Sequence, residues 1–160
     1  MALRLTEIAR KTLSSYFEKK KFDLDDKTKK SFSKKGASFV TLTKKGELRG
    51  CVGSLEPSRE LWKDIQENAI NAGIYDPRFP PITKEEFEGI QIEVSVLSIS
   101  KIMKFENPDD LLKKINNKMG IILKKGMRSA TFLPQVWEEL PDKKQFLEHL
   151  SMRREQKKEN

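Results

Sequence analysis

Two short turns that contain glycine restrict the fold of this chain more than any other sequence feature. In each, Lys-Lys-Gly separates two runs rich in apolar and β-branched residues: 37–43 and 48–53 around the first turn, 119–123 and 127–133 around the second. Two such runs joined by a short turn with Gly are typical of an antiparallel β-hairpin. The sequence therefore predicts at least two hairpins.

Helix signals surround these hairpins. Residues 3–20 carry an apolar stripe at helical spacing. Four further helices are predicted from residues that favour a helix N-cap, which are Ser58, Thr83, Asn107 and Asp142. The polar, basic stretch 23–35 is expected to be a surface loop.

A single strand separates the two hairpins. Between Gln91 and Ser98, Ile92, Val94 and Val96 alternate with polar residues, as in a strand with one buried face. Apart from the short helix after Thr83, the element order is helix, hairpin, helix, strand, helix, hairpin, helix. This order predicts an α+β fold with a mainly antiparallel or mixed sheet flanked by helices. Residues 1–150 are expected to form a single domain, undivided or with two subdomains, and 151–160 a basic, disordered tail.

The charge and residue counts limit the classes of function. The chain has 32 Lys and Arg residues against 24 Asp and Glu, a net charge of +8. A basic excess attracts nucleic acid, but few of these lysines alternate with aromatic residues, so at best weak nucleic-acid binding is expected. One cysteine and one histidine form neither an internal disulfide nor a closed zinc site, so no metal site is predicted.

The chain shows no targeting or membrane signal. Charged residues occur throughout its first ten positions, which predicts that no signal peptide is present. No run approaches the roughly 18 apolar residues that a membrane helix needs. A cytoplasmic protein without membrane association is therefore expected.

The strand 48–53 carries the strongest chemical signal. Alternation places Leu48 and Val52 toward the core and puts Arg49 and Cys51 together on the other face, about 7 Å apart. A guanidinium at that distance favours the thiolate and lowers the cysteine pKa from its usual value of about 8.5. This pattern indicates a nucleophilic or anion-binding site with catalytic roles for Cys51 and Arg49.

The glycines of this strand have two interpretations. Gly50 and Gly53 leave backbone amides exposed, so an anionic ligand could approach them. Alternatively, the glycines serve a β-bulge, and Cys51 is an inert buried residue.

Five other residues are weaker candidates. Asp76 and Arg78 lie in a proline-braced loop that suits a ligand clamp, or they form an ion pair that holds the loop shut. Glu93, a candidate ligand-binding residue, lies within a strand, where its carboxylate could bind the Arg78 or Arg49 guanidinium or face solvent. Gln135 follows a proline in a turn, where its amide could bind a ligand. His149 is the single ordinary general base near neutral pH, and its helix position also fits a plain surface histidine.

Four segments together resemble one known family. They run in the family's order from about residue 39 to residue 150 and read GELRGCVG, YDPRFPP, IEVSVLS and FLPQVWEELPDKKQFLEHL. They are similar to the AMMECR domain, known in prokaryotes as AmmeMemoRadiSam system protein A. The resemblance implies a two-part α+β domain with a cleft beside residues 48–53.

The resemblance also implies a cellular context. The family's name indicates a shared pathway with a Memo-like protein and a radical SAM enzyme, and a nucleotide or small anion as the ligand of the cleft. It implies neither a reaction nor a cofactor. Family members commonly have a second cysteine where this chain has Ser151, and they continue through a further segment. A mechanism with two thiols is therefore not expected. Without the further segment, the edge of the sheet is expected to be open to a partner.

Three functions fit these residues. The chain is an enzyme, or the partner of one, that uses Cys51 as a thiolate and Arg49 as the anion holder. Alternatively, it is a nucleotide-binding or nucleic-acid-binding module that uses its positive charge. As a third alternative, it is an adaptor that docks a Memo-like or radical SAM partner without chemistry of its own.

Overall fold

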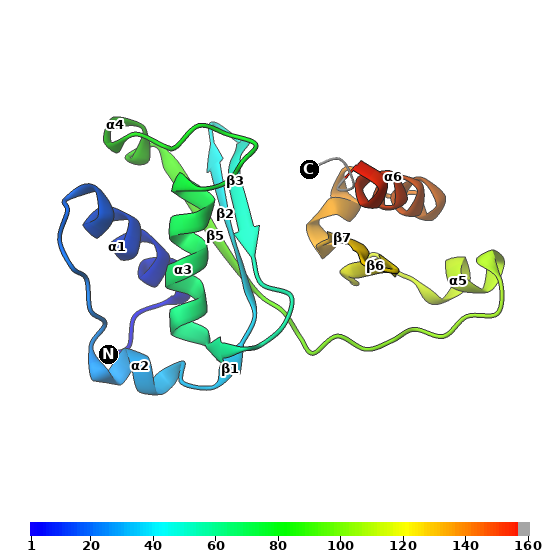
Figure 1. The fold of residues 1–160 in the computed structure, drawn as a ribbon, viewed down its shortest axis with the longest axis horizontal. Helices are drawn as coiled ribbons and strands as arrows, with labels where there is room; N and C mark the ends of the chain where they lie inside the picture. The colour runs from blue at the N-terminus through cyan, green and yellow to red at the C-terminus, as the bar shows by residue number, and fades with distance from the viewer. Residues whose placement is uncertain (157–160) are drawn as a thin grey trace. The chain divides into compact units, whose positions relative to one another are not determined.

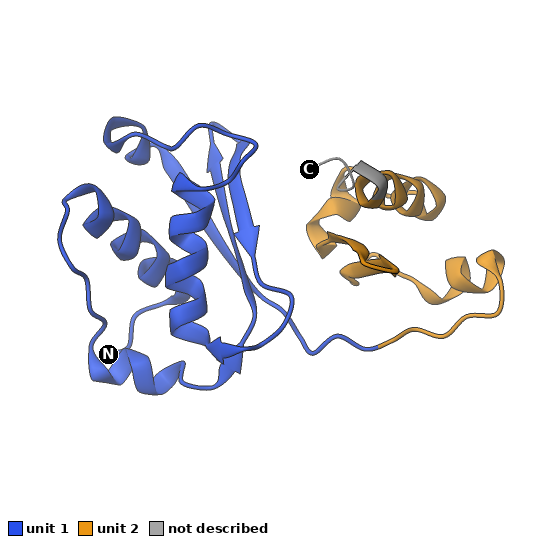
Figure 2. Ribbon diagram, in the orientation of Figure 1, with its two compact units in different colours: residues 1–101 blue, residues 102–160 orange. Residues whose placement is uncertain are grey.

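The computed structural model describes residues 1–156. The chain divides into two compact units, Met1–Lys101 and Ile102–Asn160 (Figure 2). Each unit contains antiparallel strands and helices, so the predicted α+β class is confirmed. Within 1–156, no helix combines the length and the apolar character that crossing a membrane requires.

A three-stranded antiparallel sheet forms the centre of unit 1. Its strands are β2 (Ser38–Lys44), β3 (Glu47–Gly53) and β5 (Ile90–Val96), with β2 in the middle. The predicted first hairpin is confirmed, and Lys45 and Gly46 at its turn both have positive φ angles, of 51° and 80°. Two such residues match the twist of a two-residue hairpin. A short second pair joins β1 (Lys35–Gly36) to β4 (Arg59–Glu60).

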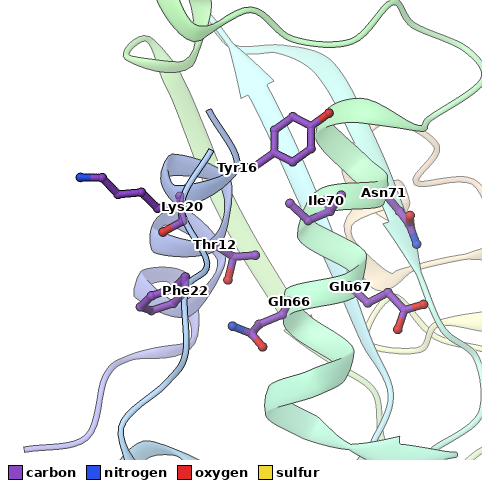
Figure 3. A pocket seen from close by; sticks show the side chains of 9 residues that line it. Thr12, Tyr16, Lys20, Phe22, Gln66, Glu67, Ile70 and Asn71 are labelled. Carbon is purple, nitrogen blue, oxygen red and sulfur yellow. The ribbon is translucent and has the colours of Figure 1, made fainter. Parts of the chain in front are cut away.

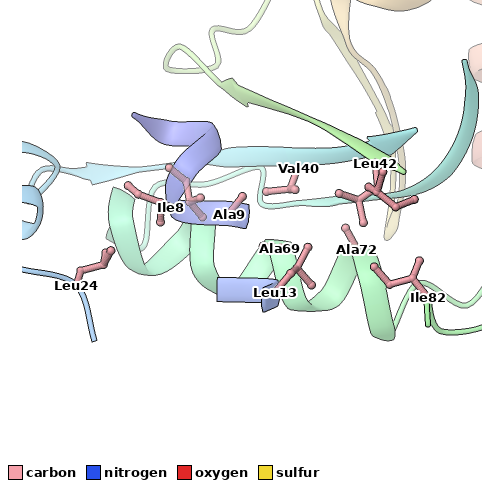
Figure 4. Close-up of a cluster of buried hydrophobic side chains, with 11 residues drawn as sticks. Ile8, Ala9, Leu13, Leu24, Val40, Leu42, Ala69, Ala72 and Ile82 are labelled. Carbon is pink, nitrogen blue, oxygen red and sulfur yellow. The ribbon is translucent and has the colours of Figure 1, made fainter. Parts of the chain in front are cut away.

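Two helices cover one face of this sheet. These are α1 (Leu5–Phe17) and α3 (Leu61–Ile74), which lie side by side in Figure 1. The apolar core lies between them and the sheet (Figure 4), and its buried residues are Ile8, Ala9, Leu13, Leu24, Val40, Leu42, Ile65, Ala69, Ala72, Ile82 and Ile90. Because both helices lie on this face, the opposite face of the sheet carries no helix of unit 1.

Two further helices of unit 1 are short. α2 (Asp26–Ser31) lies within 23–35, so the prediction of a continuous loop there is wrong. Asp25 caps this helix by accepting a hydrogen bond from the Thr28 N–H at 2.8 Å, a signal hidden by the polar composition. α4 (Lys84–Phe87) begins with the predicted capping box of Thr83 and Glu86.

Unit 2 has its own core. It contains α5 (Pro108–Lys114), the hairpin of β6 (Ile121–Lys125) and β7 (Arg128–Phe132), the 3₁₀ helix η1 (Pro134–Glu138) and α6 (Lys143–Gln156). The second predicted hairpin and the caps at Asn107 and Asp142 are confirmed. The buried core residues are Ile115, Ala130, Phe132, Trp137, Phe146 and Leu150.

Three predicted details differ from the structure. Leu48 is 45% exposed, because a β-bulge pairs Leu42 with Gly50 and Thr43 with Leu48, which leaves Arg49 as an extra residue and breaks the alternation. α3 starts at Leu61 instead of after Ser58, because the intervening residues pair as β4. α6 continues to Gln156, so residues 151–156 are helical, and 157–160 lie outside the described residues.

Candidate functional site

The loop that follows α3 closes the edge of the sheet at Cys51. Cys51 lies in the edge strand β3, and its backbone N–H and carbonyl bond to this loop instead of to β2. The Cys51 N–H donates to Asp76 Oδ2 at 3.0 Å, and Arg78 Nη2 donates to the Cys51 carbonyl at 3.2 Å. Asp76 and Arg78, two of the predicted site residues, therefore contact the backbone of a third, Cys51. The sequence did not predict this contact.

Asp76 accepts the hydrogen bonds that hold this loop in place. It is 4% exposed and accepts hydrogen bonds from the backbone N–H, Nε and Nη2 of Arg78, at 3.1, 3.1 and 2.8 Å. Burial by itself would raise the pKa of this carboxyl. The hydrogen bonds from the Arg78 side chain and from the Cys51 and Arg78 N–H groups outweigh burial and lower the pKa below its usual value. Asp76 is therefore a carboxylate at neutral pH, and it holds the loop against β3.

Arg49 is bound by the carboxylate of Glu86, which the sequence predicted only as part of the capping box of a helix. Arg49 Nε and Nη2 donate to the two carboxylate oxygens of Glu86 at 2.6 and 3.2 Å, and Lys44 Nζ lies 3.1 Å from Glu86 Oε1. The Arg49 hydrogen bond is the largest influence on the pKa of Glu86. Together with Lys44 and the Thr83 N–H, it lowers this pKa to about 2, against the opposing effect of burial.

Cys51 lies in a row of polar side chains on the face of the sheet opposite α1 and α3. Its Sγ is 3.3 Å from Thr41 Oγ1, and the strand register places Thr41 opposite both Cys51 and Glu93. Cys51 is half-buried, and Glu93 is exposed. A thiol, a hydroxyl and a carboxylate thus follow one another over three neighbouring strands. Thr41 went unpredicted because nothing in its local sequence indicates chemistry.

Arg78 is a charged neighbour of Cys51, through its hydrogen bond to the Cys51 carbonyl. Its pKa is raised, mainly by the side-chain hydrogen bond to Asp76, against the effect of burial and with smaller charge interactions with Asp76 and Cys51. The Arg78 side chain is 44% exposed, whereas that of Arg49 is 13% exposed. The predicted pairing of Cys51 with Arg49 stays a prediction, and the structure adds Arg78 as a second candidate for the same role.

One aromatic ring joins the two arginines. The guanidinium carbons of Arg49 and Arg78 lie 5.9 and 5.4 Å from the centre of the Phe79 ring. Arg49 Nη1 is buried and has no hydrogen-bond partner among the described residues. Both guanidinium groups therefore lie against the same aromatic ring, in the loop that borders Cys51.

Both glycines of the strand have a packing role. A Cβ at Gly50 would lie 2.1 Å from the Ala72 carbonyl oxygen of α3, and one at Gly53 would lie 2.2 Å from the Phe39 ring. Close helix packing and a covering aromatic ring are therefore enough to explain both residues. Their proposed contact with a ligand stays a prediction.

A buried polar network fixes the far end of β3. The Asp64 carboxylate, from the first turn of α3, accepts hydrogen bonds at 2.7–3.1 Å from four residues, which are Ser38, Ser54, Arg59 and Asn68. Sequence reasoning missed this network, because an acidic residue in a first helical turn is explained by the helix dipole alone.

Two predicted site residues belong to unit 2. Gln135 lines a hollow of about 440 Å³ together with Asn117, Pro134, Trp137 and Glu138. His149 is exposed on α6. Their predicted ligand-binding and catalytic roles stay predictions. No group of three or more His, Cys, Asp or Glu side chains in the described part of the chain is arranged to hold a metal ion.

Known proteins resemble this chain in sequence and fold. The model of the AMMECR1 family matches residues 6–160. A protein of Nanoarchaeum equitans is 39% identical over 150 residues, covering 92% of this chain and 83% of the other. One of Methanopyrus kandleri is 42% identical over 159 residues, covering 93% and 74%. The crystal structure of an uncharacterized protein from Pyrococcus horikoshii matches with a TM-score of 0.86 and 31% identity, covering 94% and 77%.

Proposed function

The chain belongs to the AMMECR1 family, and from this premise we propose that unit 1 binds a small anionic group, such as a phosphate, beside the thiol of Cys51. The observation that carries the proposal is the hydrogen bond from Arg78 to the Cys51 carbonyl at 3.2 Å. It holds a partly exposed guanidinium next to a half-buried thiol. Guanidinium groups bind phosphate and carboxylate through planar pairs of N–H donors.

The surroundings support an anion more than a cation. Asp76 and Arg78 balance each other, whereas Glu86 is bound by both Arg49 and Lys44, so this second group keeps one positive charge. Phe79 and the guanidinium of Arg49 add a nearby ring and a second positive group. An incoming anion would therefore meet Arg78 first, with Cys51 within reach for chemistry.

The thiol of Cys51 could also react with the bound molecule. Thr41 Oγ1 contacts the sulfur, and Glu93 follows Thr41 in the same row, so a hydroxyl and a carboxylate are available near a reacting thiol. The resemblance to AmmeMemoRadiSam system protein A suggests which proteins act together with this site. We propose that a Memo-like protein and a radical SAM enzyme supply or consume the bound molecule.

An NMR titration of the whole ¹⁵N-labelled chain with inorganic phosphate tests the binding proposal. We expect saturable changes in the amide signals of Cys51 and Arg78, because phosphate would compete for the Arg78 guanidinium. Arg78→Gln should abolish these changes, whereas Lys84→Gln, which removes the same charge from an exposed neighbouring position, should preserve them. Changes that never saturate, or that persist in Arg78→Gln, would contradict the proposal.

A further inference from the structure

A groove of about 400 Å³ lies between α1 and α3, apart from the residues of the Cys51 site. Its lining residues are Thr12, Ser15, Tyr16, Lys20, Phe22, Gln66, Glu67, Ile70 and Asn71. The volume is within the range of sites that hold small molecules. Figure 3 shows Tyr16 and Ile70 between the two helices, with Gln66 reaching from α3 toward Thr12 and Phe22.

The polar side chains of the groove are available to a ligand. Ser15, Gln66 and Asn71 make no side-chain hydrogen bond to any residue that the structure describes. Their hydroxyl and amide groups can both donate and accept. A ligand with donors and acceptors on one edge would therefore find complementary partners here.

The groove offers no uncommitted charge. Of its two charged residues, Lys20 pairs with Glu18 at 3.4 Å, and Glu67 pairs with Arg59. An ionic ligand would have to displace one of these pairs. The aromatic rings of Tyr16 and Phe22 and the side chain of Ile70 instead offer apolar surface, which suits the face of a planar ring.

We infer that this groove is a binding site for a neutral heteroaromatic molecule of the nucleobase class. Such a molecule combines a planar ring, which packs on Tyr16, Phe22 and Ile70, with an edge of donors and acceptors. Amide side chains pair with those edges through two hydrogen bonds. The site is separate from the proposed anion site, because the two share no residue and differ in the charge that they accept.

Titration of the whole ¹⁵N-labelled chain with adenosine, followed by NMR, tests this inference, with ribose as the probe control. Adenosine should cause saturable changes at Ser15, Gln66 and Asn71, and ribose should cause none. Tyr16→Ala and Gln66→Leu should each weaken binding by about tenfold, because each removes a ring contact or an edge contact. Lys63→Ala, an exposed change elsewhere on α3, should leave binding unchanged.

Two outcomes would overturn the inference. One is the lack of saturable change at these amides with adenosine up to about 10 mM, which corresponds to no useful affinity. The other is equal binding by the wild type, Tyr16→Ala and Gln66→Leu, with thermal unfolding confirming that both variants are folded. Because phosphate reports on Cys51 and Arg78, and adenosine on the groove, either proposal can fail while the other holds.

Discussion

Gly50→Ala is expected to lower the free energy of unfolding by about 3 kcal/mol, at the upper end of the usual cost of overpacking. The added Cβ would lie 2.1 Å from the Ala72 carbonyl oxygen. Because this oxygen belongs to the backbone of α3, it has no rotamer that moves it away, so the whole helix must shift from β3. The same shift would displace Asp76, which follows α3 and holds the Cys51 N–H.

Urea unfolding of Gly50→Ala and of a control variant, Gly89→Ala, separates the cost of this clash from the general cost of replacing glycine by alanine. At Gly89 the nearest atom to an added Cβ is 3.8 Å away, an ordinary van der Waals contact, so that variant should stay close to the wild type. If both variants lost the same small amount of stability, α3 would not pack against β3 as closely as described.

Glu86→Ala is expected to cost about 3 kcal/mol at neutral pH, because it leaves the largely buried guanidinium of Arg49 without its carboxylate partner. The cost should also depend on pH. The pKa of folded Glu86 is lowered from 4.5 to about 2, so its contribution is fully present above pH 4.5. It is lost as the pH falls through this interval toward 2. The wild type should therefore lose stability more steeply than Glu86→Ala between these two pH values.

Measuring the free energy of unfolding of both proteins from pH 4.5 to about pH 2 checks the direction of the change in stability and the pH range in which it occurs. Glu85→Ala serves as the control, because Glu85 is exposed in the same helix and makes none of these contacts. Parallel pH curves for the wild type and Glu86→Ala, or a Glu85→Ala curve that matches Glu86→Ala, would contradict the assigned ion pair.

The elements of the fold were largely predictable because their signals are local. Lys44-Lys45-Gly46 predicts a hairpin by itself, and Asn107 before Pro108 predicts a helix start. The exposure of Leu48 was not predictable, because the bulge at Arg49 depends on how β3 pairs with β2. A one-residue bulge reverses the face of every residue on one side of it.

The site was predictable in its residue types but not in its pairings. Cys51, Asp76 and Arg78 are unusual in their own segments, which is why the sequence indicated each of them. The position of the Arg49 side chain depends on Glu86, which is 37 residues away in the sequence, and Arg78 reaches the Cys51 carbonyl over 27 residues. Contacts over such distances leave no trace in local periodicity, and the same is true of the Thr41 hydroxyl at the sulfur.

The rate at which iodoacetamide alkylates Cys51 in the native chain, with and without inorganic phosphate, tests the central claim most directly. The account predicts that the folded protein reacts within about tenfold of the urea-unfolded chain, as an accessible thiol does. Phosphate should slow the reaction, chloride at equal ionic strength should not, and Arg78→Gln should remove the protection. A thiol that reacts only after unfolding, or at a rate that phosphate leaves unchanged, would contradict an anion site at Cys51.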